Sequence, residues 1–407
     1  MSAPLIVQKD RRLVKFLYTM GLQILLSRPQ FTHFLYIVAG IIGGGHRLTI
    51  SNIHRTTAAK RAICSMTRFL SRSPWDCAMV NRYRKEYVME YLHENVRPNK
   101  VGFLIPDDTA IVKDPDTKHI EGLNFHFSHL DGKTKWSHQV VSSHYSIDGF
   151  SLPMNYTLYL RKDYCKEHGL EFKSKIDIAI DQINDFQPIP GTKTYLLTDV
   201  WYTSQRVIEA ALKKGIHTIG AIKRNRIIYP KGIRIPIAGF LRYICESDLD
   251  TVTVDGKLYD VYRYEGKVGK IDNAVVVMCW EGGYDKQDKP FCILCTDVEL
   301  EDSKIIAYYL VRWDIETSYR YFKERLGFDH YQVRSLEAIQ RFWCAVYMAY
   351  TYLELYRAEN KVRFRNLGEA IDAYRQGNAR RLIKFAYEAA LNGQPLPSVY
   401  RNLGLAA

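Results

Sequence analysis

The sequence predicts an α/β protein in which a mixed sheet with flanking helices is interrupted by a β-rich insertion and lies between two helical regions. Three observations lead to this prediction. Apolar residues recur at helical spacing through the first hundred residues, whereas from Val101 strands alternate with helices. Between Asn225 and Asp302 the sequence is rich in strands, and beyond Gly327 it returns to helices. Strands that alternate with helices favour a sheet covered by helices.

These changes of pattern predict five segments along the 407 residues. Length alone favours more than one domain, since single cores rarely grow beyond about 250–300 residues. The segments are a helical basic domain at 1–98, the first part of the sheet domain at 99–225, the β-rich insertion at 226–302, the second part of the sheet domain at 303–360, and a C-terminal helical region at 361–407.

Composition favours a folded protein that binds nucleic acid. Hydrophobic residues make up 47% of the chain and charged residues 25%, as in ordinary folded domains. The net charge is +13, and the first hundred residues hold 16 Lys and Arg against 5 Asp and Glu. Such a basic region suits a polyanion, because each neutralised phosphate releases counterions. The longest apolar run, Phe34–Ile42, is shorter than the ~20 residues of a spanning helix even when it is extended loosely to 31–45, so we expect no membrane partner.

The cysteines and histidines give no sign of a metal site. The eight cysteines are scattered, as expected in a reducing cytoplasm, and Cys292 and Cys295 form a lone CxxC without a second pair at zinc-finger spacing. The first residues, MSAPLIVQKDRR, lack the order of a signal peptide, so we expect a cytoplasmic, nucleoid-associated protein. Histidines without consistent ligand spacing, which we expect to be structural, stand at 126, 129, 138 and 144.

The region 1–98 is predicted to be a basic helical domain. Helical periodicity covers Lys9–Ser27, Arg55–Ser71 and Asp76–Asn95, while GIIGGG at 40–45 breaks the pattern. Such helices suit DNA, since a helix can enter a groove while Lys and Arg contact phosphates. A basic bundle that serves only solubility is the alternative. The candidate DNA-binding residues here are Arg55, Lys60 and Arg61.

The sheet domain is predicted from short apolar runs. In chain order these are strands at 102–108, 136–149 and 150–160, a helix at 173–186, a strand at 194–199, a helix at 204–214 and a strand at 217–225. The dipeptide Asp148-Gly149 predicts a hairpin turn between two of the strands. In the insertion, Asp255-Gly256 predicts a second hairpin, and further strands are expected at 273–280 and 291–297. Beyond the insertion, two more helices are expected at 336–356 and 367–391.

The stretch Ser303–Gly327 is predicted to be one helix, because it has no internal Gly or Pro. At about 100° per residue, one face carries a stripe of five residues: Tyr309, Arg312, Glu316, Arg320 and Lys323. A solvated charged face would show the same i, i+4 spacing of Arg312, Glu316 and Arg320. The two interpretations, a solvated helix surface and a functional site, therefore differ in whether other parts of the chain supply partners for Glu316.

Two aspartates supply such partners. Asp108 and Asp199 each end an apolar strand, and open sheets place their sites at the carboxyl ends of strands. If the two strands are neighbours, these carboxylates and Glu316 converge, and such a cluster needs cations. Two Mg²⁺ ions about 3.5–4 Å apart suit carboxylate oxygens and can act on both oxygens of a phosphoryl displacement. Asp107 is the alternative to Asp108, whereas Asp297 fits better in the turn ahead of the helix.

Four residues of the 303–327 stretch resemble the YREK signature of bacterial insertion-sequence DDE transposases: Tyr309-x2-Arg312-x3-Glu316-x6-Lys323. The Asp108-Thr109 pair after a strand, the LLTD that ends at Asp199, and the order Asp, Asp, β-insertion, Glu also resemble that family. The resemblance covers about 102–327, whereas the N-terminal region is similar only in being helical and basic. The Asp-Thr match selects Asp108 over Asp107.

This resemblance implies an RNase H-like core in which Asp108, Asp199 and Glu316 bind two Mg²⁺ ions, for which Mn²⁺ would substitute. It implies cut-and-paste transposition, with cleavage of double-stranded DNA at terminal inverted repeats and joining of the 3′-hydroxyl ends to target DNA. A homodimer in a synaptic complex is implied as well. The residues expected to contact DNA phosphates are Tyr309, Arg312 and Lys323, with Arg320 beside them.

The resemblance also implies an aromatic residue that stacks on a flipped base. Trp280 in the insertion is the candidate, with Trp201 and Trp313 as rivals. A Trp280 ring packed in the core of the insertion is the alternative.

Two other functions fit the same features. One is an RNase H-like DNA nuclease without strand transfer, and the other is a catalytically silent DNA-binding protein derived from a transposase. The presence of all three carboxylates disfavours the silent protein. A glycosidase with paired carboxylates would leave the basic N-terminal region without a role.

Overall fold

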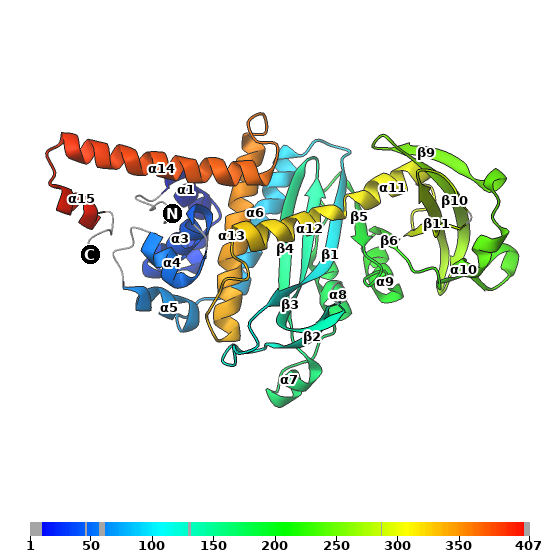
Figure 1. Ribbon diagram of the computed structural model, residues 1–407, viewed down its shortest axis with the longest axis horizontal. Coiled ribbons are helices and arrows are strands. Elements are labelled where there is room, and N and C mark those ends of the chain that lie inside the picture. Colours follow the sequence, from blue (N-terminus) through cyan, green and yellow to red (C-terminus); the bar gives the residue numbers. More distant parts are fainter. Residues whose placement is uncertain (1–9, 45–46, 57–61, 129–131, 286, 403–407) are drawn as a thin grey trace. The chain divides into compact units, whose positions relative to one another are not determined.

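The fold is mixed α/β, as the sequence predicts, and a computed structural model describes residues 10–44, 47–56, 62–128, 132–285 and 287–402 (Figure 1). Contacts divide the chain into two compact units. Unit 1 comprises Met1–Asn95, Ala110–Gln139 and Thr317–Ala407, and unit 2 comprises Val96–Thr109 and Val140–Glu316. Within the described ranges, no helix is both long and apolar enough to cross a membrane.

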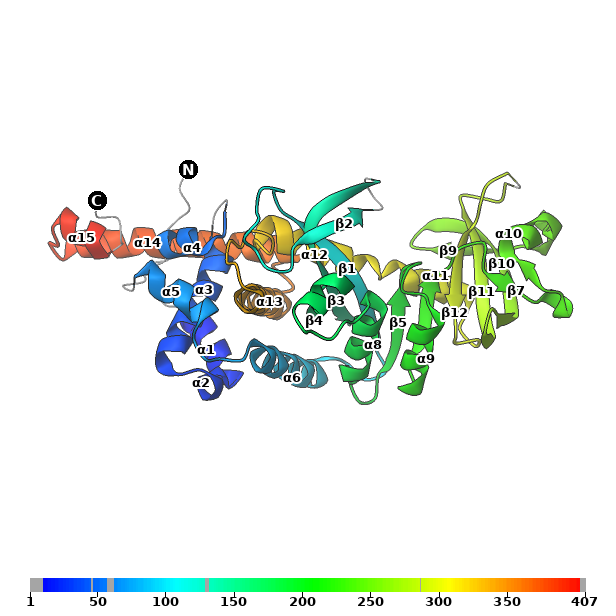
Figure 2. The same ribbon diagram turned by 90° about the horizontal axis from the view of Figure 1, so that it is seen from below.

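Unit 1 consists mainly of helices around one buried helix, α13. Its elements are α1 (Arg11–Thr19), α2 (Leu22–Leu25), α3 (Arg28–Gly43), α4 (Ile50–Thr56), α5 (Ile63–Ser71), α6 (Cys77–Asn95), β2 (Asn124–Ser128), the π-helical turn η4 (Tyr321–Arg325), α13 (Leu336–Glu359), α14 (Leu367–Leu391) and α15 (Leu396–Asn402). Helix α13 contacts α3, α5, α6 and α14 (Figure 2). Its middle is buried on every side, as expected of a helix that is apolar all round.

The N-terminal helices confirm a helical region but differ from the expected bounds. Gly21, whose φ is 81°, separates α1 from α2 within the helix expected at 9–27. Helix α3 continues through Gly40, where a break was expected, because the glycine lets α4 approach: a Cβ at Gly40 would lie 2.4 Å from Cγ2 of Ile53. Part of the helix expected at 55–71 lies outside the described residues, since 57–61 are not among them.

A histidine is buried in the core of unit 1. The Nε2 atom of His138 lies 2.8 Å from the carbonyl oxygen of Glu121, and its Nδ1 atom lies 2.5 Å from the hydroxyl of Tyr331. Trp343 packs edge-on against the imidazole ring. Burial lowers the pKa of His138 to about 4, so the side chain is neutral in the folded protein at physiological pH.

Because of His138, we expect unit 1 to lose stability as the pH falls from about 6.5 to about 4. The unfolded chain takes up a proton near the ordinary pKa of 6.5, whereas the folded chain stays neutral until about 4. The stabilisation is fully present above the unfolded pKa, and its loss amounts to about 3 kcal/mol. Urea unfolding from pH 4 to 7.5 should show a smaller pH slope for His138→Gln than for the wild type. Equal slopes would contradict the assignment.

Unit 2 is organised around a mixed sheet. Its strands are β1 (Val101–Val112), β3 (Lys133–Ile147), β4 (Phe150–Tyr159), β5 (Lys193–Thr198), β6 (His217–Ala221), β7 (Ile227–Ile228), β8 (Ile235–Pro236), β9 (Asp250–Val254), β10 (Lys257–Val268), β11 (Ile271–Glu281) and β12 (Phe291–Cys295), with the first residues of β3 and the last of β1 assigned to unit 1. The strand order is β3-β1-β5-β6-β12-β11-β10-β7-β8, with β4 paired to β3 and β9 to β10. Strand β5 is parallel to both β1 and β6, whereas β12 is antiparallel to β6.

Helices cover both faces of the parallel strands. The helices of this part of the chain are α7 (Lys162–Glu167), α8 (Lys175–Asp185), α9 (Gln205–Lys213), α10 (Ile237–Phe240), α11 (Asp302–Leu310) and α12 (Trp313–Arg320), with short 3₁₀ turns at Pro230–Gly232, Leu241–Tyr243 and Glu246–Asp248. The residues of α12 from Thr317 onward are assigned to unit 1. Helix α8 packs on α9 and β4, and α9 packs on β6. Helix α11 contacts β6, β9 and β12, and Figure 2 shows it on the other side of the strands from α8 and α9.

The strand-rich stretch at 226–302 continues the sheet of unit 2. Leu294 on β12 pairs with Gly220 on β6, and β11 and β10 follow in antiparallel order. Both expected hairpin turns are confirmed, since Asp148 and Asp255 have φ values of 47° and 48° and each is followed by a glycine with positive φ.

The helix expected at 303–327 is wrong as one continuous helix. The structure has α11, then a break, then α12 and η4. At the break the backbone N–H of Arg312 donates to the carbonyl of Tyr309, a three-residue spacing that is tighter than that of an α-helix. The hydroxyl of Ser146 donates to the carboxylate of Asp314 at 2.7 Å and ties the start of α12 to β3. The uniform stripe is therefore interrupted at Arg312.

Candidate active site

The candidate site begins where the pairing between two neighbouring parallel strands, β1 and β5, ends. Leu104 on β1 pairs with Leu196 on β5, and these are the last positions at which β1 and β5 pair with each other. Three residues further along each chain lie Asp107 and Asp199, so the register brings these two aspartates to the same level. Strand β1 continues beyond Asp108, contrary to the expectation that it ends there.

A tight turn after β5 fixes Asp199. The Oδ1 atom of Asp199 accepts the backbone N–H of Tyr202 at 2.8 Å, and its carbonyl oxygen accepts the hydroxyl of Thr203 at 2.6 Å. Gly220 on β6 leaves room for this turn, because a Cβ there would lie 2.3 Å from Oγ1 of Thr198 and 2.4 Å from Oγ1 of Thr203. Burial raises the pKa of Asp199, so a neighbouring cation would stabilise its charged form.

Arg312 connects Asp107 to Glu316. Its Nη1 atom lies 3.6 Å from Oδ2 of Asp107, and its Nη2 atom donates to Oε1 of Glu316 at 2.5 Å. Burial, together with the charges of Asp199 and Asp108, raises the pKa of Asp107 to about 8. The break between α11 and α12 thus places one guanidinium between two of the carboxylates.

Asp108 has a different set of partners. The ammonium group of Lys175 donates to its Oδ2 atom at 2.6 Å, and the hydroxyl of Tyr202 donates to its Oδ1 atom at 2.9 Å. Lys175 is the first residue of α8, whose start is held by a capping box between Ser174 and Asp177. A capped helix therefore positions the cation that neutralises Asp108.

The carboxylates suit a hard divalent cation in chemistry, but they are not gathered around one point. Among the residues that the structure describes, no three His, Cys, Asp or Glu side chains lie close enough together to hold a metal ion. The available donors are carboxylate oxygens, which Mg²⁺ prefers. The raised pKa of Asp107 reflects an excess of buried negative charge that such an ion would offset. The residues present therefore fit a metal by donor type.

The structure brings together only part of the stripe expected around Glu316. Tyr309 is half-buried, with its ring centroid 5.9 Å from the guanidinium carbon of Arg312 and 5.3 Å from the ring centroid of Phe291. Arg320 and Lys323 belong to unit 1. Arg320 is exposed there, while burial lowers the pKa of Lys323.

The three tryptophan candidates have different surroundings. Trp280 is only 5% exposed, donates through Nε1 to the carbonyl of Asp288 and packs edge-on against Tyr284. It lies in the hydrophobic core formed with β10, β11 and β12, as the alternative to a base-stacking role predicted. Trp201 and Trp313 are 57% and 60% exposed, and Trp201 is two residues beyond Asp199.

The remaining predicted residues lie apart from the carboxylates. Asp297 accepts hydrogen bonds from Lys193 and Tyr195, each at 2.6 Å, and so ties the end of β12 to β5. Arg55 is exposed on α4. Lys60 and Arg61 lie outside the described residues.

Two neighbours of Asp108 were missed from the sequence. Lys175 and Tyr202 are 67 and 94 residues away along the chain, so no local pattern connects them to Asp108. The position of Tyr202 three residues after Asp199 was the one available signal, because an aspartate often accepts a backbone N–H shortly after itself in a turn.

Two known families match the sequence. A family described as "Transposase DDE domain" matches residues 144–352, and one described as "DDE superfamily endonuclease" matches residues 22–238, each more than half of the chain. No curated protein matches the sequence. The first range contains Asp199 and Glu316, and the second contains Asp107, Asp108 and Asp199. The chain therefore belongs to the DDE transposases and carries a nuclease domain of the transposase type.

Proposed function

We propose that the protein is a cut-and-paste transposase, which cuts transposon ends by metal-dependent phosphodiester hydrolysis and joins the freed 3′-hydroxyl ends to target DNA. The observation that carries this proposal is that Asp107 on β1 lies level with Asp199 just beyond β5, with Glu316 tied to Asp107 through Arg312. Family membership supports the class of reaction, and the positions of these carboxylates support the place in the fold where it would occur.

Two Mg²⁺ ions, or Mn²⁺ in their place, are proposed to bind Asp199, Glu316 and one aspartate of the 107–108 pair. When bound, the metal lowers the pKa of a water molecule and offsets negative charge at phosphorus. The Asp-Thr motif assigns Asp108. The geometry favours Asp107, which lies level with Asp199 and contacts Arg312, while a lysine and a tyrosine already engage Asp108.

The cationic and aromatic residues are proposed to hold the DNA. Arg312 keeps Glu316 and Asp107 in place and offers a guanidinium fork that suits a phosphate. Tyr309 and Lys323 are proposed as further phosphate contacts, with Arg320 beside them. Because Trp280 is buried, the exposed Trp201 is the better candidate for stacking on an unpaired base.

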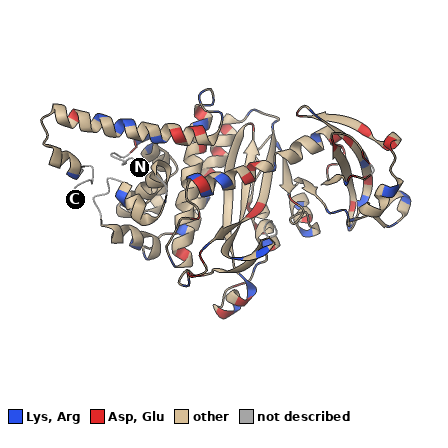
Figure 3. Ribbon diagram, in the orientation of Figure 1, with Lys and Arg blue, Asp and Glu red and all other residues tan. Residues whose placement is uncertain are grey.

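The partners are proposed to be the terminal inverted repeats, the target DNA and a second copy of the protein. Basic residues recur along α14 and on the N-terminal helices of unit 1 (Figure 3). Such charge supports binding along a phosphate backbone. The exposed Arg55 is one proposed contact.

The test is a cleavage and joining assay with DNA that carries the inverted repeats flanking the coding region. We expect Mg²⁺-dependent cuts at the repeat ends and, with pre-cut ends, joining to a target plasmid. Cutting without joining would indicate an RNase H-like nuclease instead. Binding without cutting, in Mg²⁺ or Mn²⁺, would indicate a silent DNA-binding protein.

Arg312→Ala is expected to lower the cleavage rate by about 10–100-fold, because a guanidinium close to the scissile phosphate stabilises developing charge. Lys323→Ala should weaken DNA engagement more mildly. Single-turnover cleavage and footprinting at the repeat ends measure both effects. Lys304→Ala is the matched control, since Lys304 is exposed on α11 and pairs only with Glu301 among the described residues. An unaltered footprint and rate for Arg312→Ala would contradict its role.

A further inference from the structure

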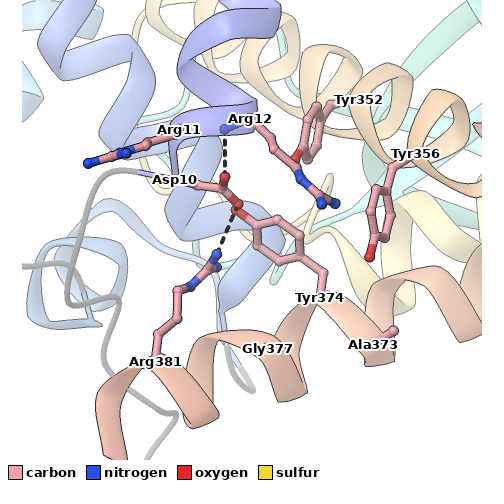
Figure 4. A pocket seen from close by; sticks show the side chains of 9 residues that line it. All are labelled: Asp10, Arg11, Arg12, Tyr352, Tyr356, Ala373, Tyr374, Gly377 and Arg381. Carbon is pink, nitrogen blue, oxygen red and sulfur yellow. Dashed lines mark hydrogen bonds and ion pairs between the residues drawn. The ribbon is translucent and has the colours of Figure 1, made fainter. Parts of the chain in front are cut away.

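A cavity of about 440 Å³ lies in unit 1 between α1, α13 and α14 (Figure 4). Its volume falls within the range of about 300–1,000 Å³ that is usual for small-molecule sites. The walls carry arginines and tyrosines: Arg11, Arg12, Arg381, Tyr352, Tyr356 and Tyr374. This cavity is distinct from the candidate active site, because Asp107, Asp108, Asp199 and Glu316 belong to unit 2.

The cavity has an excess of positive charge. Its one carboxylate, Asp10, is buried and accepts the backbone N–H of Arg12 at 2.9 Å, the hydroxyl of Tyr374, and Nη1 of Arg381 at 3.5 Å. The guanidinium of Arg12 forms neither a hydrogen bond nor an ion pair with any residue that the structure describes. Figure 4 shows it directed between Tyr352 and Tyr356. A guanidinium in this position can receive an anion, and phosphate suits its fork best.

The tyrosines supply flat faces beside that cation. The rings of Tyr352 and Tyr356 are nearly parallel, with an interplanar angle of 11° and centroids 6.4 Å apart. Tyr374 stands almost perpendicular to Tyr352, at 86°. Tyr356 is the least buried of the three, and although its ring also packs against Phe364 with centroids 5.5 Å apart, it lines the cavity. The volume exceeds what a phosphate alone would fill, and nucleobases stack readily on such rings.

We propose that this cavity binds a nucleoside monophosphate unit, with the phosphate on Arg12 and the base against Tyr356. The unit can come from a DNA strand or from a free nucleotide, and both share the same chemistry. The inference rests on the cavity alone and does not depend on the proposed cleavage reaction.

Calorimetric titration of the full-length protein with dTMP, thymidine and inorganic phosphate tests this proposal. We expect dTMP to bind in a one-to-one ratio and at least about 10-fold more tightly than either fragment, since each fragment lacks one of the two contacts. Arg12→Gln and Tyr356→Leu should each weaken dTMP binding by about 10-fold. Arg28→Gln, which removes an exposed arginine from the start of α3, is the control and should leave the affinity unchanged.

A 5′-phosphorylated tetrathymidylate separates the two sources. If its Arg12-dependent binding is tighter than that of dTMP, the unit belongs to a DNA strand, whereas equal or weaker binding indicates a free nucleotide. Phosphate that binds as tightly as dTMP, or dTMP affinity that is the same in Arg12→Gln and the wild type, would overturn the proposal. Neither result bears on cleavage at the carboxylates.

Discussion

Replacing Asp199 with asparagine is expected to reduce DNA cleavage by at least about 10³-fold while DNA end binding is retained. Asparagine keeps the shape of the side chain and can still accept the N–H of Tyr202, so the turn after β5 should persist. What is lost is the negative charge that a divalent ion requires. Glu316→Gln should have a similar effect, because its charge faces Arg312 at the same site.

The same assay decides between the two adjacent aspartates. We expect Asp107→Asn to abolish cleavage and Asp108→Asn to reduce it less, because Asp107 lies level with Asp199 and contacts Arg312. The Asp-Thr motif leads to the opposite expectation. Asp272→Asn, at an exposed position of β11, is the matched control for loss of one aspartate charge.

Two measurements separate chemistry from binding in these variants. Gel analysis of end cleavage in Mg²⁺ reports the reaction, and fluorescence anisotropy of labelled repeat DNA reports binding. Thermal unfolding with and without Mn²⁺ gives a readout that does not need activity, since an ion that binds the folded state raises the melting temperature. Retained cleavage in Asp199→Asn would remove Asp199 from the site, and loss in Asp108→Asn alone would restore the motif assignment.

Local patterns were enough to predict several parts of this site. The turn at Asp148-Gly149 was predictable because two adjacent residues with positive φ are favoured by Asp-Gly. Strand β5 and the position of Asp199 just beyond it follow from one apolar run and its polar end. Helix α14 was predicted at its observed bounds, Leu367–Leu391. In each case the determining residues are neighbours in the sequence.

The parts that were missed depend on residues that are distant in the sequence. Gly40 looks like a helix breaker, yet its role is set by Ile53 on the next helix. The break at Arg312 depends on partners on β1 and α12 that spacing alone does not reveal. The partners of Asp108 come from α8 and from the turn after β5. A regular period of 100° per residue assumes an ideal helix, and tertiary contacts override it here.

Replacing Trp343 with alanine is expected to lower the unfolding free energy of unit 1 by about 3–5 kcal/mol, the largest stability effect of any substitution considered. Trp343 is fully buried on α13, and its Nε1 donates to the carbonyl of Phe328 at 3.2 Å. Its ring also packs against those of Phe328 and Tyr331. Alanine would leave a cavity, and it would leave the carbonyl of Phe328 without this donor.

Trp343→Phe separates these two costs. Phenylalanine restores most of the volume but cannot donate a hydrogen bond, so we expect a loss of about 1–3 kcal/mol. Trp313→Ala is the control for removing a tryptophan, because Trp313 is 60% exposed and should change stability by less than about 0.5 kcal/mol. Urea unfolding followed by circular dichroism measures all three variants. Similar midpoints for Trp343→Ala and Trp313→Ala would show that α13 is not the centre of the unit 1 core, since a buried and an exposed tryptophan would then contribute equally.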